Sequence, residues 1–200
     1  MNVLNQVRRQ RGLGEGEGVA GGDNETLFSV HRLDTPTSGL LVFAKDADAA
    51  GKLQRGFQNR ARDRISKEGG DNEEEKAISK FYVAVVSRKL KKKMGVLRGN
   101  LVKGRRGSWK LEEKGEDNFA QTNFVDLGSA GGSVGGRRVI LMRPITGRTH
   151  QLRVTMKSLG GAIVGDERYG SGGGEEGRLL LHACGIRLDL KSMEVRPRGG

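Results

Sequence analysis

Cysteine is nearly absent from this sequence, and its scarcity excludes several classes of protein. The chain of 200 residues has one cysteine, Cys184, which cannot form an internal disulfide or supply a cysteine-rich zinc site. The three histidines, His31, His150 and His182, are far apart and lack the spacing of metal ligands. We therefore expect a protein of a reducing compartment that binds no metal, and no sequence motif indicates a cofactor.

Long apolar runs are missing as well. No stretch approaches the ~20 apolar residues that a membrane-spanning helix needs. We therefore expect a soluble, intracellular monomer without a membrane partner, located in the cytoplasm or in an organelle. A length of 200 residues corresponds to one domain with a substantial core.

Basic residues, in contrast, are abundant. The sequence has 36 lysines and arginines against 24 acidic residues, which gives a net charge of +12. Such an excess favours a polyanionic partner, nucleic acid before a membrane surface. A soluble protein with many surface lysines is the alternative that charge alone leaves open. The densest basic run, residues 88–114, predicts a basic hairpin, which is either a phosphate-contact surface or a solvated charged face.

Glycine is also frequent, at more than twice its usual share of about 7 %, and it is clustered. The clusters lie in residues 12–22, 128–136 and 170–177. We interpret them as flexible loop insertions, because such segments bury too little apolar surface to order themselves. We expect a flexible, basic and glycine-rich N-terminus over residues 1–26, a folded domain over 27–192 and a tail over 193–200.

The segment around Asp34 places a carboxylate on a tight turn. Pro36 and Gly39 follow it and favour a turn. The apolar run over residues 40–44 then predicts a buried strand. A loop at the edge of a buried strand is a rigid place to present a catalytic group. The alternative is an aspartate that only caps the turn.

Two further segments carry clear periodicity. Asp46 can cap an amphipathic helix over residues 47–62. Apolar residues recur at helical spacing along it, at Ala50, Leu53, Phe57 and Ala61. Residues 81–86 predict a strand, in which Tyr82 shares a face with Ala84 and Val86.

A second helix is predicted after an apolar strand at residues 139–142. Thr149 can cap this helix, and Gly160 and Gly161 can end it. Its apolar face consists of Leu152, Met156 and Leu159. His182, considered alone, is expected to be a core histidine.

Five segments resemble, in order, the signatures of the RluA-type pseudouridine synthases. The longest are residues 31–45, with His-Arg-Leu-Asp before Thr-Ser-Gly, and residues 144–154, with Gly-Arg-Thr-His-Gln-Leu-Arg. Residues 80–85, 162–170 and 178–183 supply the other three. The resemblance implies an α/β domain, with a mixed and mostly antiparallel sheet flanked by helices.

The resemblance also implies catalytic roles for three residues. Asp34 is the catalytic carboxylate. Arg153 pairs with it and keeps it ionised and oriented, since a planar guanidinium suits a carboxylate. Tyr82 lines the site and stacks on the target base. The active cleft is then expected between the Asp34 loop, the Tyr82 strand and the Arg153 helix.

Three more residues are implied in substrate binding. Arg32 holds the RNA backbone or fills the space that an extruded base leaves. Arg148 binds phosphate. Leu181 packs beneath the uracil ring.

The resulting functional hypothesis is an isomerase that converts specific uridines of structured RNA to pseudouridine, in ribosomal RNA more than in transfer RNA. Asp34 would attack the sugar or the uracil, or remove a sugar proton, and the sequence leaves these routes open. A catalytically inactive RNA-binding relative is the alternative. A nucleoside hydrolase would need a metal-binding cluster or a second carboxylate, and none stands out.

Two features depart from the family pattern. No Asn-Lys-Pro-x-Gly segment precedes the Asp34 motif, which indicates a truncated chain or a fragment. Thr155 stands where the family usually has histidine.

Overall fold

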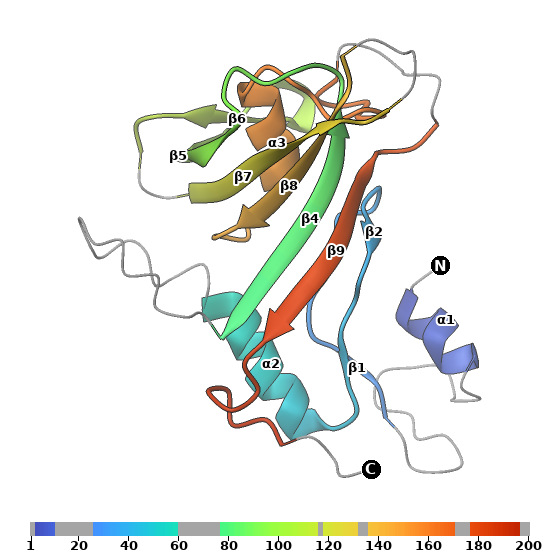
Figure 1. Cartoon of the computed structure of the whole chain (residues 1–200). Coiled ribbons are helices and arrows are strands. Elements are labelled where there is room, and N and C mark those ends of the chain that lie inside the picture. Colours follow the sequence, from blue (N-terminus) through green and yellow to red (C-terminus); the bar gives the residue numbers. More distant parts are fainter. Residues whose placement is uncertain are drawn as a thin grey trace.

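The structure is a computed structural model that describes residues 3–10, 26–59, 77–115, 118–131, 136–170 and 177–196 (Figure 1). The helices are α1 (Val3–Gln10), α2 (Ala47–Asn59), α3 (Gln151–Ser158) and the 3₁₀ turn η1 (Arg105–Gly107). The strands are β1 (Phe28–Ser29), β2 (Ser38–Gly39), β3 (Phe43–Ala44), β4 (Ile78–Val86), β5 (Met94–Lys103), β6 (Trp109–Glu112), β7 (Phe119–Ser129), β8 (Arg138–Pro144) and β9 (Leu181–Leu188).

Seven strands form one sheet in the order β2-β9-β4-β8-β7-β5-β6, and β1 pairs with β3 separately. The β2–β9 pair is parallel and the other pairs are antiparallel. The mixed, mostly antiparallel sheet expected from the sequence is therefore confirmed. In Figure 1 the long strands β4 and β9 run side by side through the middle of the molecule, with β2 along the free edge of β9.

Helix α3 packs on one face of the sheet and closes the main core. Tyr82, Ala84 and Val86 of β4 lie on this face and contact a buried cluster that includes Leu152 and Met156 of α3. The alternation predicted for residues 81–86 is confirmed, because the intervening side chains are only half-buried. Apolar side chains at helical spacing thus fix α3 against the sheet.

The end of α3 is formed as its glycines predict. The N–H of Gly160 donates to the carbonyl of Lys157 at 3.0 Å, and the N–H of Gly161 donates to Met156 at 3.1 Å. This is a Schellman motif, which requires a left-handed residue after the helix. Gly160 supplies it with φ +84°.

Helix α2 covers the other end of β4 and β9 (Figure 1). The carboxylate of Asp46 accepts the main-chain N–H of Ala49 at 2.8 Å, so the predicted N-cap is confirmed. Ala50, Leu53 and Phe57 face a second apolar cluster, and the predicted Ala61 lies outside the described residues.

Two expectations for the sequence around α2 and the C-terminus need correction. The predicted buried strand over residues 40–44 is reduced to Phe43–Ala44, and Leu40 is 49 % exposed. Leu40 directly follows the edge strand β2, and within the described ranges no further strand pairs with that edge. Residues expected to begin a tail also take part in the fold, since Met193 and Val195 pack against the cluster beneath α2.

The structure also changes the expectation of a flexible N-terminus over residues 1–26. Residues 3–10 form helix α1, with Leu4 packed against Leu27. Arg8 is 1 % exposed, and its guanidinium donates to the carbonyl of Leu27 at 2.8 Å. Most of the glycine clusters at 12–22 and 170–177 lie outside the described residues.

His182 is exposed, so the expectation of a core histidine is wrong. Side chains of β9 alternate between the two faces of the sheet, and its neighbours Leu181 and Ala183 occupy the buried face. His182 instead shares a hydrogen bond of 3.0 Å with the hydroxyl of Ser38. Among the described residues, no helix is long and apolar enough to cross a membrane.

Candidate active site

The loop that carries Asp34 is closed by its main chain and anchored to β9. The N–H of Thr37 donates to the carbonyl of Asp34 at 2.8 Å. The next residues, Ser38 and Gly39, pair in parallel with His182 and Ala183. The Asp34 carboxylate makes no hydrogen bond to the described part of the chain, so the alternative of a merely turn-capping side chain does not hold there.

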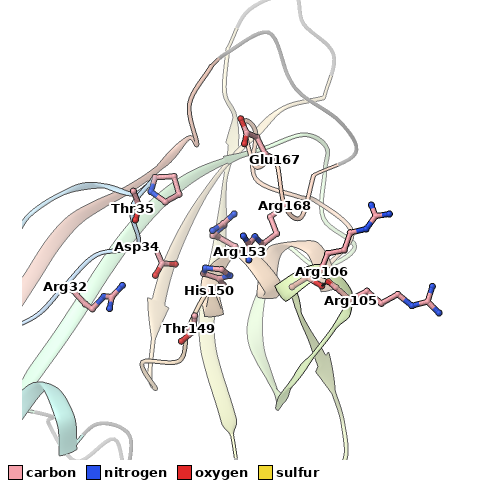
Figure 2. A pocket seen from close by; sticks show the side chains of 12 residues that line it. Arg32, Asp34, Thr35, Arg105, Arg106, Thr149, His150, Arg153, Glu167 and Arg168 are labelled. Atoms are coloured by element: carbon pink, nitrogen blue, oxygen red, sulfur yellow. Dashed lines mark hydrogen bonds between the residues drawn. The ribbon is translucent and has the colours of Figure 1, made fainter. Parts of the chain in front are cut away.

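Asp34 opens into a cavity of about 690 Å³. Four segments line it: the Asp34 loop, the η1 turn, the start of α3 and the turn at residues 167–168. The lining residues are Arg32, Asp34, Thr35, Pro36, Arg105, Arg106, Ser108, Thr149, His150, Arg153, Glu167 and Arg168. Five arginines against two carboxylates make this cavity suited to a polyanion. Figure 2 shows Asp34 facing His150 and Arg153 across the space.

Arg153 is held by Asp166 rather than by Asp34. Its Nε and one Nη donate to the two carboxylate oxygens of Asp166 at 2.8 and 2.7 Å. The two side chains are only 8 % and 0 % exposed. The direct pair between Arg153 and Asp34 that the family resemblance implied is therefore replaced by a buried pair with Asp166.

Electrostatics keep this buried pair charged and connect it to Asp34. Burial alone would raise the pKa of Asp166, but hydrogen bonds from Arg153 and from main-chain N–H groups hold it below its ordinary value. The pKa of Arg153 is raised, chiefly by its hydrogen bonds to Asp166 and further by the charge of Asp34. Arg153 thus attracts Asp34 across the cavity without a hydrogen bond between them.

Asp166 also organises the turn that follows it. Its Oδ1 accepts the main-chain N–H groups of Arg168 and Tyr169 at 3.1 and 3.0 Å. The guanidinium of Arg168 in turn donates to the carbonyl of Gly107 at 2.8 Å. One carboxylate therefore links α3, the turn at 167–169 and the η1 turn, which form three walls of the cavity.

His150, and not Thr149, stands at the N-cap position of α3. His150 has a left-handed backbone, with φ 54° and ψ 17°, and neither residue provides a side-chain cap. The predicted capping role of Thr149 is therefore wrong, and Thr149 lines the cavity instead.

Gln151 fixes the start of α3 against the sheet. Its amide oxygen accepts the hydroxyl of Thr146 at 2.7 Å and the N–H of Arg148 at 3.0 Å. Its amide nitrogen donates to the carbonyl of Gln121 and the hydroxyl of Thr122 on β7. Gln151 is 4 % exposed, so this largely buried network fixes the start of the helix that carries His150 and Arg153.

Comparison with known proteins agrees with this geometry. Residues 8–158 match the family model described as RNA pseudouridylate synthase. The chain belongs to this family. It is 39 % identical over 163 residues to an uncharacterized RNA pseudouridine synthase of Haemophilus influenzae, covering 82 % of this chain and 63 % of the relative.

Two further relatives extend the comparison. The ribosomal large subunit pseudouridine synthase C of Rickettsia conorii is 35 % identical over 144 residues, which are 71 % of this chain and 41 % of that protein. A solved structure of human RNA pseudouridylate synthase domain containing 1 superposes with a TM-score of 0.65 at 28 % identity, covering 82 % of this chain and 64 % of that one. The chain thus spans roughly two fifths to two thirds of the length of these relatives.

In this family member, Tyr82 and Leu181 lie in the core rather than on the cavity lining. They are 8 % and 3 % exposed and belong to the cluster beneath α3. Leu33, which directly precedes Asp34, packs against the same cluster. Leu181 also accepts the hydroxyl of Ser38 through its carbonyl at 3.4 Å, so both residues support the loop that carries Asp34.

The two arginines expected to bind RNA differ in position. Arg32 is exposed and lines the cavity beside Asp34 (Figure 2). Arg148 is half-buried, and its Nε donates to the carbonyl of Phe119 at 3.0 Å, outside the cavity lining. Arg105 and Arg106, from the basic run at residues 88–114, also line the cavity, and so does Arg168, which the sequence analysis did not single out.

Sequence reasoning did not assign functions to His150, Gln151, Asp166 or Tyr169. All four stand inside the matched segments 144–154 and 162–170, and this is the signal that could have found them. Among the described residues, no group of three or more histidine, cysteine or acidic side chains could hold a metal ion.

Proposed function

We propose that this protein is an RNA pseudouridine synthase that isomerises uridines of ribosomal RNA, with Asp34 as its catalytic carboxylate. The observation that carries the proposal is a carboxylate without a hydrogen-bond partner among the described residues, in a cavity lined by five arginines. Family membership and the names of the relatives, which include a ribosomal large subunit synthase, support the reaction and the RNA class.

The reaction needs little beyond these groups. The C1′–N1 bond of uridine breaks, the uracil rotates, and C5 bonds to C1′. The proton that leaves C5 is balanced by the proton that N1 takes up. No electrons are exchanged with a redox partner and no external group is transferred. Asp34 acts as a nucleophile toward the sugar or the uracil, or as the base that removes a sugar proton. Each route begins with an accessible carboxylate, as Asp34 is here.

The basic walls of the cavity suit an extruded nucleotide. A base inside a helix must leave its stack before Asp34 can reach its sugar. Arg32 is placed to fill the space that the base leaves, or to hold the backbone beside it. Arg105 and Arg106 extend from the opposite wall, where phosphates of the flanking nucleotides would pass (Figure 2).

Tyr82, Leu181 and Arg153 retain supporting roles in the proposal. Tyr82 and Leu181 belong to the buried cluster against which Leu33 packs, so they support the loop of Asp34 from beneath. Arg153 lines the cavity and supplies positive charge toward Asp34. Arg148 anchors the motif to β7 and contributes charge for RNA.

The test is release of tritium from ribosomal and transfer RNA labelled at C5 of uridine. We expect the wild type to release tritium from ribosomal RNA and Asp34→Asn to release none, with RNA affinity kept within a few-fold. Asp48→Asn is the matched control, because Asp48 is an exposed residue of α2 outside the cavity. Release by Asp34→Asn would reject its role. RNA binding without release by the wild type would favour the inactive relative.

A further inference from the structure

His150 is a polar side chain of the cavity to which the reaction as described assigns no task. It lines the cavity with Asp34 and lies at the first turn of α3. Its backbone is left-handed, a conformation that is uncommon outside glycine and in which asparagine, aspartate and histidine are enriched. The rigid network of Gln151 directly follows it, so the position of the imidazole is fixed from the helix side.

The hydrogen bonds around Tyr169 determine which imidazole nitrogen carries the proton. The Tyr169 hydroxyl oxygen accepts the main-chain N–H of Trp109 at 3.1 Å and lies 2.8 Å from Nδ1 of His150. Among the described residues, His150 is the acceptor available to the phenolic proton. Tyr169 therefore donates to Nδ1, and a neutral His150 carries its own proton on Nε2.

The surroundings favour that neutral form. Burial lowers the pKa of His150 below its ordinary value of 6.5. The charges of Arg153 and Arg168 lower it further, and those of Asp34 and Asp166 oppose them. The pKa of Tyr169 is raised, chiefly by burial, so its hydroxyl stays protonated and able to donate.

Nε2 of His150 makes no hydrogen bond to the described part of the chain. The ring is also oriented by its edge-to-face contact with Tyr169, with centroids 5.7 Å apart and planes at 79°. The neutral ring thus keeps one free N–H donor, on a side chain that lines the cavity together with Asp34 (Figure 2).

We propose that His150 is a further catalytic residue, whose Nε2–H donates a hydrogen bond to a carbonyl oxygen of the uracil. The inference rests on the proposed pseudouridine synthase function. When the C1′–N1 bond breaks, its electron pair stays on the uracil, and the negative charge spreads from N1 to the ring carbonyl oxygens. A fixed donor stabilises that charge more than it stabilises the neutral base, and it keeps hold of the uracil during rotation. His150 loses no proton in this step.

The first test is the tautomer, read by nitrogen NMR of the wild type with labelled histidine. The sequence has three histidines, so His150 can be assigned by comparing the wild type with His150→Asn. We expect its Nε2 to be protonated and its Nδ1 to be unprotonated at neutral pH. A proton on Nδ1 would overturn the proposal, whether or not the protein has activity.

The second test is single-turnover tritium release by His150→Asn. Asparagine tolerates the left-handed backbone, so the substitution removes the imidazole without adding strain. We expect the rate constant to fall about 10²-fold to 10³-fold, the usual loss for one such donor. RNA affinity should stay within about threefold of the wild type, since the interaction strengthens with the developing charge. Ser158→Asn, at the exposed end of the same helix, is the control and should keep the wild-type rate.

The outcomes separate this inference from the proposed function. Wild-type release with an unchanged rate in His150→Asn overturns the role of His150 alone. So does weaker RNA binding with an unchanged rate at saturation, which would indicate a ground-state contact. No release by the wild type rejects the function, and this inference with it.

If His150→Asn does not fold, Tyr169→Phe provides the kinetic test. Loss of the phenolic donor should lower the rate constant at least tenfold. It should also shift the NMR signal of Nδ1 of His150, which loses its hydrogen bond. An unchanged rate constant would overturn the proposal.

Discussion

The guanidinium of Arg153 and the carboxylate of Asp166 are joined by two parallel hydrogen bonds in a place where both side chains are almost fully buried. This pair fixes one wall of the cavity, and the same carboxylate fixes the turn beyond it. Removing one partner of such a pair is far more damaging than the net strength of the pair suggests, because the other charge stays buried.

Asp166→Ala should therefore lower the free energy of unfolding by about 3–5 kcal/mol. Chemical denaturation of the two proteins measures this difference. Asp48→Ala is the control, because Asp48 pairs with Lys52 at 2.7 Å but is 74 % exposed. Its loss should stay below about 1 kcal/mol. A loss of similar size in both variants would contradict the prediction that breaking a buried ion pair costs more than breaking an exposed one.

Gly39→Ala should disrupt the loop of Asp34. Gly39 has φ +120°, and a Cβ there would overlap the main chain of Ala183 on β9. Backbone cannot move aside as a flexible side chain can, so we expect a loss of stability of about 1–3 kcal/mol. We also expect the rate of tritium release to fall by more than this loss of stability alone would cause.

Gly51→Ala is the matched control for that substitution. Gly51 lies inside α2, where its nearest neighbour to a new Cβ would be the flexible end of Arg55 at 3.4 Å. Alanine should raise stability there by up to about 1 kcal/mol. Thermal unfolding of both variants should show shifts of opposite sign, and equal shifts would exclude the clash at β9 as the cause.

The stability of the protein should decrease in mildly acidic solution because of His31. Burial, followed by the charge of Lys80, lowers the pKa of His31 from 6.5 to about 4. Its neutral Nε2 accepts the N–H of Val42 at 3.0 Å. His31 binds a proton more readily in the unfolded chain than in the folded protein. Its contribution to the free energy of unfolding is therefore complete above pH 6.5 and is lost as the pH falls toward 4.

The expected contribution is about 1–2 kcal/mol, after allowance for the solvent exposure of the half-buried ring. Unfolding curves measured between pH 7 and pH 4 test it, with His31→Asn for comparison. The variant should be less stable at pH 7 and should lose less stability on acidification. The stabilising effect of Asp166 is lost at lower pH than that of His31. The pKa of Asp166 is lowered in the folded protein, so its stabilisation is lost only as the pH falls below 3.8, the ordinary pKa of an aspartate. Parallel pH curves for the two proteins would reject the role of His31.

Arg105→Gln should weaken RNA binding in a salt-dependent way. Arg105 is exposed on the η1 turn and lines the cavity wall opposite Arg32. Loss of one phosphate contact should reduce the slope of log affinity against log salt by about 0.7–0.9. Filter binding at several salt concentrations measures the slope. Lys191→Gln, an exposed substitution near the C-terminus, should leave it unchanged, and an equal change in both would indicate a general effect of net charge.

Local signals in the sequence predicted the elements whose structure is determined locally. Asp46 caps α2 through a neighbour three residues away, and Gly160 ends α3 because the residue after the helix needs a left-handed backbone. The mixed sheet and the proximity of Asp34 to Arg153 followed from the family resemblance rather than from periodicity.

The features that were missed depend on contacts distant in sequence or on very short elements. Arg153 was expected to pair with Asp34, and its pairing with Asp166 depends on a turn whose carboxylate also accepts two main-chain N–H groups. Helix α1 has eight residues, too few for a clear period. The exposure of His182 depends on which face of β9 is covered, and residues distant in sequence decide this by packing against Leu181 and Ala183.

The parallel pairing of β2 with β9 has a consequence for biosynthesis. Ser38 and Leu181, which share a hydrogen bond, are 143 positions apart, so the strand that steadies Asp34 is synthesised long after the Asp34 loop itself. During translation the nascent chain therefore carries the Asp34 motif long before β9 is available to pair with it, and closing so large a loop is slow. A chain released early would therefore contain both signature motifs and yet lack a formed active site.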